Sequence, residues 1–224
     1  MQGDIGFIFH VGLYNFYAFD DIKNVHKRKT MNGSEWYYGR LIAGNYMQPA
    51  GYKETQEHHE EQEYGDYFDA KLNIGRDSIA FWMETCLLFH AKYVIITARH
   101  HDGYCLWNTN NTIKKSKIDI LQIFKDEAKS RGLMFGIYYS WMEFGTPMTV
   151  NYFNSVCIPQ VTELLEYEPD MFWFDGDWEI KQKSIFKTMD SFLQTLRSRN
   201  ISFNDRLGKI KKENRPWTIE PNYR

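Results

Sequence analysis

The chain has 224 residues, of which 43% are hydrophobic and 25% are charged, and its formal net charge is −2. This length suffices for one sizeable core or two small domains. The near-neutral charge gives no electrostatic footprint for binding nucleic acid or an anionic membrane. No apolar run approaches the ~20 residues that a membrane-spanning helix needs. The beginning of the chain lacks the basic and apolar regions of a secretory signal, so we expect a cytoplasmic location by default.

The cysteine and aromatic contents bear on the kind of site. Cys86, Cys105 and Cys157 are scattered, which predicts neither a disulfide framework nor a CxxC metal site. We expect all three to be reduced and mostly buried. Aromatic residues make up 17% of the chain. Such rings fill a core, and they also form the platforms on which sugar rings stack.

Short apolar runs alternate with amphipathic segments, a pattern typical of βα units and a parallel sheet. Strands are predicted at residues 5–12, 93–98, 133–140, 170–176, 201–206 and 217–223. Helices are predicted at 77–91 with Asp77 as N-cap, at 119–132 opening on Asp119, at 151–167 with Pro159 in a first turn, and at 184–200.

Ionisable residues gather where these strands end. The strand ends carry, in chain order, His10, the group Arg99 to Asp102, and then Tyr138, Asp175, Arg206 and Glu220. Parallel strands of a (β/α) barrel deliver their carboxyl ends to one face, where active sites are built. The pattern therefore predicts an α/β fold of the (β/α)8-like TIM-barrel type. A doubly wound open sheet is the alternative, although no glycine-rich phosphate turn follows the first strand.

A long connection interrupts the alternation between Leu13 and Arg76. It contains the aromatic stretch SEWYYG at 34–39 and an acidic run at 54–69. A connection of this length is usually functional or disordered. Its tyrosines and tryptophan argue against simple disorder.

Six short motifs occur in one order along the chain: FIFHVGLY, SEWYYG, ARHHDGYCLW, GIYYS, FWFDGDW and NDR. Their combination resembles glycoside hydrolase family 29, the α-L-fucosidases, over nearly the whole chain. The resemblance implies a single catalytic (β/α) barrel domain over residues 1–224. It also implies retaining hydrolysis of terminal α-L-fucose from glycoconjugates, a fucosylated glycan as substrate, and no metal or organic cofactor.

Retaining glycosidases need two carboxyl groups about 5–5.5 Å apart, one as nucleophile and one as acid/base. Asp175 matches the family's nucleophile motif, follows an apolar strand and precedes a glycine, and Asp177 is the competing candidate. The expected acid/base is Glu220, because burial among aromatic rings would keep it protonated for departure of the leaving group. Glu213, in a basic run, is the alternative.

The resemblance also implies a set of sugar-binding residues. Expected to hydrogen-bond fucose hydroxyls or steady the carboxylates are His10, Glu35, His100, His101 and Arg206; expected to pack on the apolar face of the sugar are Trp36, Tyr138 and Trp173. Fixed donors and acceptors combined with rings suit a neutral deoxy sugar. Tyr138 is preferred to Tyr139 because neighbouring residues of a strand face opposite sides.

Two departures from the family pattern stand out. Val11 occupies a position where the family usually has tryptophan. About six barrel strands are predicted, whereas the family continues with further strands and a C-terminal β-sandwich. Six parallel strands alone would leave the edges of the sheet uncovered. Three explanations stay open: the sequence is a fragment, the barrel closes differently, or another chain, such as a second copy in a homo-oligomer, covers the edges.

Two other functions compete with an active fucosidase. One is a degenerate barrel that binds fucose without turnover. The other is a metal-dependent hydrolase with His10, His101 and Asp175 as ligands. The second is poorly supplied with ligands, because no histidine follows His101. The fucosyl linkage stays open.

Overall fold

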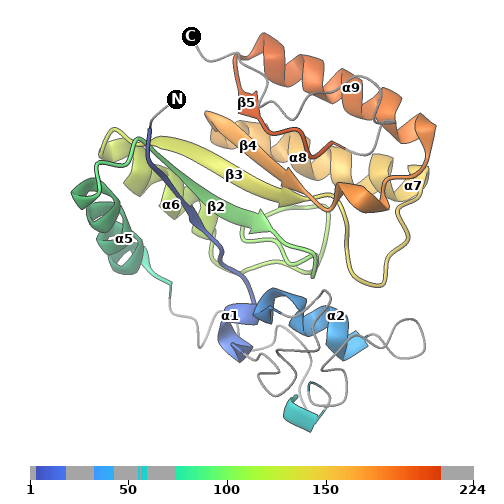
Figure 1. Ribbon diagram of the computed structural model, residues 1–224, viewed down its shortest axis with the longest axis horizontal. Coiled ribbons are helices and arrows are strands. Elements are labelled where there is room, and N and C mark those ends of the chain that lie inside the picture. Colours follow the sequence, from blue (N-terminus) through green and yellow to red (C-terminus); the bar gives the residue numbers. More distant parts are fainter. Residues whose placement is uncertain (1–3, 19–32, 43–54, 56, 60–73, 208–224) are drawn as a thin grey trace.

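The computed structural model describes residues 4–18, 33–42, 55, 57–59 and 74–207. At its centre lies a five-stranded sheet (Figure 1). The strands are β1 (Gly6–Phe9), β2 (Tyr93–Arg99), β3 (Met134–Ser140), β4 (Met171–Asp175) and β5 (Ser202–Phe203). All neighbouring pairs are parallel, and the spatial order follows the chain from β1 to β5. A doubly wound sheet reverses its strand order at a switch point. The uninterrupted order is that of a (β/α) barrel, so the predicted fold class is confirmed.

Helices connect the strands. The α-helices are α1 (Tyr14–Tyr17), α2 (Tyr37–Ile42), α5 (Arg76–Leu88), α6 (Ile120–Ser130), α7 (Val150–Tyr152), α8 (Ile158–Leu164) and α9 (Lys183–Ser198). Short 3₁₀ turns lie at Ser34–Trp36, Leu165–Tyr167 and Asp177–Glu179, and one π-helical turn lies at Phe153–Cys157. Figure 1 shows α5 and α6 beside one half of the sheet and α8 and α9 beside the other, while α1 and α2 lie beyond the end of β1.

The two faces of the sheet differ in burial. The face that packs against the helices is apolar and buried, and its strand residues include Val94, Ile96, Phe135, Ile137, Phe172 and Phe174. The opposite face carries a smaller cluster, Ile95, Tyr138 and Met171. On β1, Ile8 keeps 45% of its surface exposed. The main core therefore lies between the sheet and its helices, and the other face is only partly covered.

Helix α9 confirms the prediction made from its periodicity. The side chains that it buries are Ile185, Met189, Phe192, Leu193 and Leu196. This is the i, i+4, i+7, i+8, i+11 set expected of an amphipathic helix packed on a core. Full burial of one such side chain is worth about 1.5–3 kcal/mol.

The two predicted N-caps had different outcomes. The Asp119 carboxylate accepts a hydrogen bond from the Gln122 N–H at 2.9 Å, which confirms the cap of α6. The cap predicted for α5 is wrong, because the helix begins at Arg76 and its cap position, Gly75, makes no side-chain bond. Asp77 instead lies inside the first turn, where the positive end of the helix dipole favours a carboxylate.

Several predicted boundaries also change. β1 stops at Phe9 and β5 is only two residues long, so both are shorter than the runs 5–12 and 201–206. The predicted helix 151–167 is divided by the π-helical turn, and Pro159 lies in the first turn of α8, as expected. The predicted strand 217–223 lies outside the described residues.

Candidate active site

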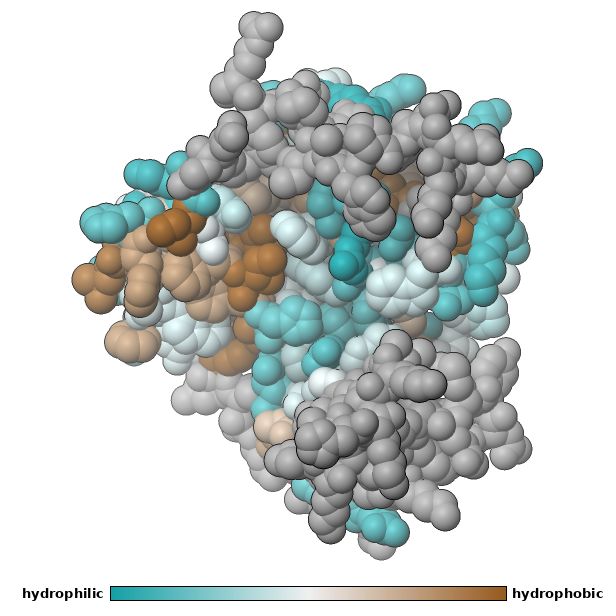
Figure 2. Space-filling model, in the orientation of Figure 1, coloured by the Kyte–Doolittle hydropathy of each residue, from teal (hydrophilic) through white to brown (hydrophobic). Residues whose placement is uncertain are grey.

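The predicted polar residues meet at the carboxyl edge of the sheet. His10 follows β1, His100 and His101 follow β2, Tyr138 lies near the end of β3, and Asp175 is the last residue of β4. Parallel strands bring these ends to one edge. With Arg206, which follows β5, these residues are referred to below as the strand-end cluster. Figure 2 shows hydrophilic surface across the middle of the molecule.

Asp175 is held by donors on both carboxylate oxygens. The Tyr138 hydroxyl donates to Oδ2 at 2.6 Å, and Arg206 Nη1 donates to Oδ1. His101 Nε2 lies 3.8 Å from Oδ2. Burial opposes ionisation of this carboxyl, but the Tyr138 hydrogen bond, the charge that His101 carries once it is protonated at low pH, and the charge of Arg206 outweigh it and hold the pKa of Asp175 below its ordinary value. The carboxylate is therefore ionised at neutral pH.

Tyr138 serves Asp175 as a hydrogen-bond donor. Burial raises the pKa of Tyr138 far above its ordinary value, and the Asp175 carboxylate raises it further. The phenol stays protonated at any working pH and can only donate to Asp175. Tyr139 lies on the other face of β3, where its hydroxyl donates to Gln160 Oε1 at 2.8 Å.

Three histidines pack against one another beside Asp175. Ring centroids are 4.8 Å apart for His10 and His100 and 4.1 Å apart for His100 and His101. Burial lowers the pKa of each, to about 4 for His101 and well below 6.5 for His100, so the imidazoles are neutral at pH 7. The Tyr14 hydroxyl contacts His10 Nδ1 at 3.1 Å. Neutral imidazoles offer one donor and one acceptor each, which suits hydroxyl recognition.

The connection after β1 brings two more predicted residues to the cluster. The Trp36 ring lies 5.5 Å from that of His101, and Glu35 is close enough to His10 to raise its pKa against the effect of burial. Trp173 is the register partner of Tyr138 and is 37% exposed. Trp173 thus presents a ring on the same face of the sheet as Tyr138.

The expected second carboxyl group is not placed. Glu220 and its alternative Glu213 lie outside the described residues. The competing nucleophile, Asp177, opens the 3₁₀ turn after Gly176, and its charge acts on Arg206. Asp177 is thus on the far side of the glycine, while Asp175 receives the Tyr138 and Arg206 hydrogen bonds.

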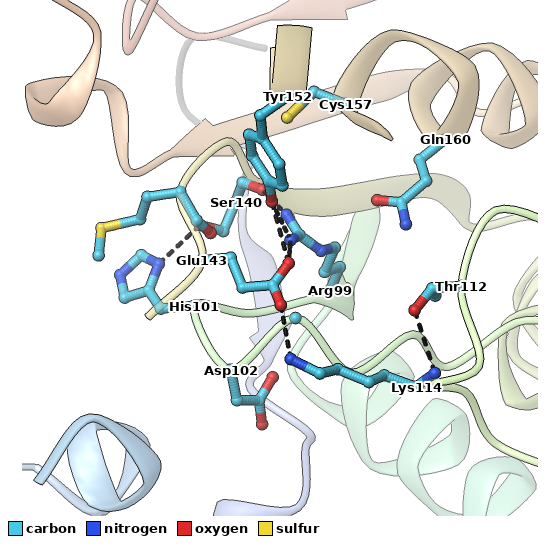
Figure 3. A network of polar contacts seen from close by, with 12 residues as sticks. Arg99, His101, Asp102, Thr112, Lys114, Ser140, Glu143, Tyr152, Cys157 and Gln160 are labelled. Atoms are coloured by element: carbon cyan, nitrogen blue, oxygen red, sulfur yellow. Dashed lines mark hydrogen bonds and ion pairs between the residues drawn. The ribbon is translucent and has the colours of Figure 1, made fainter. Parts of the chain in front are cut away.

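Sequence reasoning missed a buried ionic network behind the cluster (Figure 3). Arg99 is fully buried, and its Nη2 donates to Glu143 Oε2 and to the Tyr152 hydroxyl, both at 2.6 Å. Glu143 also accepts from Lys114 Nζ at 2.6 Å. The prediction included Arg99 at a strand end and Tyr152 within the predicted helix 151–167, but Glu143 lies between the predicted elements.

Aromatic neighbours of His101 were also missed. The rings of Phe144 and Trp178 lie 5.6 and 5.4 Å from the His101 ring. In the sequence, Trp178 stands out only as the last residue of the FWFDGDW motif. Together with Trp36 these rings enclose the imidazole and fix its plane.

Other expectations concern metals, thiols and membranes. Among the described residues, no group of three or more His, Cys, Asp or Glu side chains is arranged to hold a metal ion, so the metal-dependent reading has no ligand set there. Cys86, Cys105 and Cys157 are free and buried, as predicted. In the described part of the chain, no helix has the length and apolarity needed to cross a membrane.

The model of the α-L-fucosidase family matches residues 2–223. The chain belongs to the α-L-fucosidase family. An α-L-fucosidase of Dictyostelium discoideum is 28% identical, over 91% of this chain and 47% of that protein. Tissue α-L-fucosidase of Homo sapiens is 25% identical, over 66% of this chain and 35% of that protein.

Solved structures support the same family. Thermotoga maritima α-fucosidase superposes with a TM-score of 0.68 at 27% identity, covering 93% of this chain and 52% of that one. The complex of the Thermotoga enzyme with fucose gives a TM-score of 0.68 at 26% identity. The chain thus spans about half the length, or less, of the α-L-fucosidases that it matches.

Proposed function

We propose that the chain is the catalytic barrel domain of a retaining α-L-fucosidase that removes terminal α-L-fucose from fucosylated glycans. The observation that carries this proposal is the ionised Asp175 carboxylate at a strand end, held by Tyr138 and Arg206. Family membership and the fucose complex of the Thermotoga relative support the choice of sugar.

In this proposal hydrolysis proceeds by double displacement. An Asp175 oxygen attacks the anomeric carbon of fucose while the glycosidic oxygen takes a proton from the acid/base, for which Glu220 is the candidate. The bond between the anomeric carbon and the leaving oxygen breaks, and a fucosyl ester of Asp175 forms. Glu220 then removes a proton from water, which attacks the same carbon and releases Asp175. Two inversions give net retention.

The strand-end cluster suits the sugar in this reaction. The neutral imidazoles of His10, His100 and His101 provide donors and acceptors for hydroxyls without adding charge beside the nucleophile. The exposed Trp173 ring offers a surface for the apolar face and the methyl group of fucose.

The test is hydrolysis of aryl glycosides by this chain. We expect release of 4-nitrophenol from the α-L-fucoside and not from the corresponding galactoside or glucoside. Asp175→Asn should lower kcat/KM by about a thousandfold or more, since it removes the nucleophile. Asp177→Asn is the matched comparison two positions away, and a loss confined to that variant would move the nucleophile to Asp177. Calorimetric binding of fucose without hydrolysis would select the degenerate binding barrel instead.

The acid/base assignment needs a separate experiment. A leaving group of low pKa departs without protonation, whereas one of high pKa requires the acid. Glu220→Gln should therefore slow hydrolysis of a methylumbelliferyl α-L-fucoside strongly and that of a dinitrophenyl α-L-fucoside little. Glu213→Gln is the matched control. The reverse outcome would assign the acid to Glu213.

We also propose that another copy of the chain covers the outer edge of β1, which among the described residues pairs only with β2. Ile5 and Ile8 are 50% and 45% exposed, and Phe81, Leu88 and Phe89 of α5 and its end are more than half exposed. Figure 2 shows apolar surface on the side of the molecule where α5 lies. Light scattering tests this: a monomer at micromolar concentration would reject it.

A further inference from the structure

Ser140 links the end of β3 to the turn that carries Asp175. It is fully buried and is the register partner of Asp175 on β4. The Trp141 N–H donates to the Asp175 carbonyl at 2.9 Å. Gly176 has a φ of 73°, and a Cβ there would lie 2.8 Å from Ser140 Oγ. Ser140 therefore packs directly against the backbone that positions Asp175.

The Ser140 hydroxyl makes two short contacts. Oγ lies 2.9 Å from the Met142 carbonyl oxygen and 2.6 Å from His101 Nδ1 (Figure 3). A serine hydroxyl has one proton, and a carbonyl oxygen can only accept. When the proton goes to Met142, Oγ accepts from His101 Nδ1–H and both hydrogen bonds form. The opposite assignment keeps only the bond to His101 and leaves the carbonyl without its donor, which is unfavourable in a buried site.

This arrangement determines what His101 presents to Asp175. Burial lowers the pKa of His101 to about 4, so the ring carries a single proton at neutral pH. With that proton on Nδ1, Nε2 is a bare acceptor, 3.8 Å from Asp175 Oδ2. Two acceptors then face one another beyond hydrogen-bond distance. A group entering beside them must donate.

The ring cannot relieve this arrangement by turning. Trp36, Phe144 and Trp178 enclose the His101 imidazole, with ring centroids 5.4–5.6 Å away. His101 is 3% exposed. The direction of Nε2 is therefore set by packing, and its protonation is set by Ser140.

We propose that Ser140 is a positioning residue that fixes the Nδ1–H tautomer of His101, so that Nε2 accepts a hydrogen bond from a substrate hydroxyl beside Asp175. The substrate part of this inference rests on the proposed fucosidase function. The tautomer part rests on the Ser140 contacts and on the burial that keeps His101 neutral. The arrangement makes one sugar hydroxyl necessary as a donor, and a deoxy or O-methyl group at that position loses the bond.

The first test is a ¹⁵N spectrum of the histidine-labelled chain at pH 7, with His101 assigned by its substitution. We expect a protonated Nδ1 and an unprotonated Nε2. In Ser140→Ala the signals should move toward a mixture of tautomers. A wild-type His101 protonated at Nε2 would overturn the proposal. This readout needs no turnover, so it stands apart from the outcome for the fucosidase activity.

The second test couples Ser140 to one hydroxyl. Ser140→Ala should lower kcat/KM for an aryl α-L-fucoside about tenfold, the value of one neutral hydrogen bond. The same comparison is then made with aryl fucosides that each lack one hydroxyl. For the one substrate that lacks the hydroxyl bound by His101 Nε2, Ser140→Ala should leave kcat/KM unchanged. Equal tenfold losses at every position would overturn the acceptor role.

Ser116→Ala is the matched control. Ser116 is also a buried serine, 1% exposed, and its Oγ accepts from the Ile118 N–H at 3.1 Å, in the connection between β2 and α6. We expect a comparable loss of stability with unchanged His101 signals and unchanged kcat/KM. If His101 lost its Nδ1–H tautomer in both Ser140→Ala and Ser116→Ala, the effect of Ser140→Ala would come from disturbed packing and not from its hydrogen bond.

Discussion

The Tyr138 hydroxyl donates a hydrogen bond of 2.6 Å to Asp175 Oδ2, joining two neighbouring strands at their carboxyl ends. Tyr138 is the register partner of Trp173, two residues before Asp175, so all three residues share one face of the sheet. This contact lowers the pKa of Asp175 together with His101 and Arg206, against the opposing effect of burial.

Removing that hydrogen bond should change the pH dependence of catalysis. In Tyr138→Phe the pKa of Asp175 rises, because a donor to the charged form is lost. The nucleophile must be ionised, so the acid limb of the kcat/KM profile moves to higher pH. A hydrogen bond to a charged group is worth ~1.5–3 kcal/mol, which predicts roughly a tenfold loss or more at the optimum. Tyr139→Phe is the control, and an acid limb that moves equally in both variants would contradict the assignment.

The buried Arg99 should stabilise the fold far more than a surface ion pair. Arg99→Met leaves Glu143 buried without its main cationic partner, for which the loss is about 3–5 kcal/mol. Lys125→Met removes the pair with Glu168, whose side chain is 83% exposed, and should change stability by less than about 1 kcal/mol. Urea denaturation measures both. A similar loss in the free energy of unfolding for the two variants would show that the Arg99 network does not stabilise the fold.

The two aspartates predicted as helix caps offer a paired test. Asp119 caps α6 and also accepts from the Tyr167 hydroxyl at 2.6 Å. Asp119→Ala should therefore lower the free energy of unfolding by about 1–2 kcal/mol. Asp77 makes no cap bond, so Asp77→Ala should change it by no more than about 0.5 kcal/mol. Thermal denaturation of both variants measures the two losses. A larger loss of stability in Asp77→Ala than in Asp119→Ala would contradict the assignment of Asp119 as the cap.

Stability should fall as the pH decreases from about 6.5 to about 4, because His101 stays neutral in the folded state. Burial lowers its pKa to about 4, with Asp175 opposing the shift and Arg99, His10 and Arg206 adding to it. The unfolded chain protonates this residue from about pH 6.5, so it binds more protons in that window. The loss reaches about 3 kcal/mol at pH 4. His101→Asn should flatten the slope; equal slopes would contradict a neutral buried imidazole.

Local patterns predicted most of the scaffold. Apolar runs that alternate with amphipathic segments are a short-range signal, and the parallel sheet followed from it. The periodicity of residues 184–200 is another such signal, and it predicted the buried face of α9. The ends of β1 and β5 were misjudged because strand length depends on pairing with a neighbour rather than on the run of apolar residues.

Long-range contacts at the site could not be predicted from the sequence in the same way. Strand ends indicated His10, His101 and Asp175, but nothing in the sequence joins Arg99 to Glu143, which is 44 residues away. The Ser140 contact with His101 spans 39 residues and depends on a single hydroxyl. Such pairs are fixed by the packed sheet and its loops, so periodicity carries no trace of them.

The most direct test of the central claim is covalent trapping of Asp175. A 2-deoxy-2-fluoro-α-L-fucosyl fluoride forms the ester readily because fluoride leaves without an acid, and the fluorine at C2 slows the subsequent hydrolysis. We predict that peptide mass spectrometry finds one fucosyl adduct, on Asp175, and none in Asp175→Asn. An adduct on Asp177, or release of fluoride without any adduct, would contradict the account.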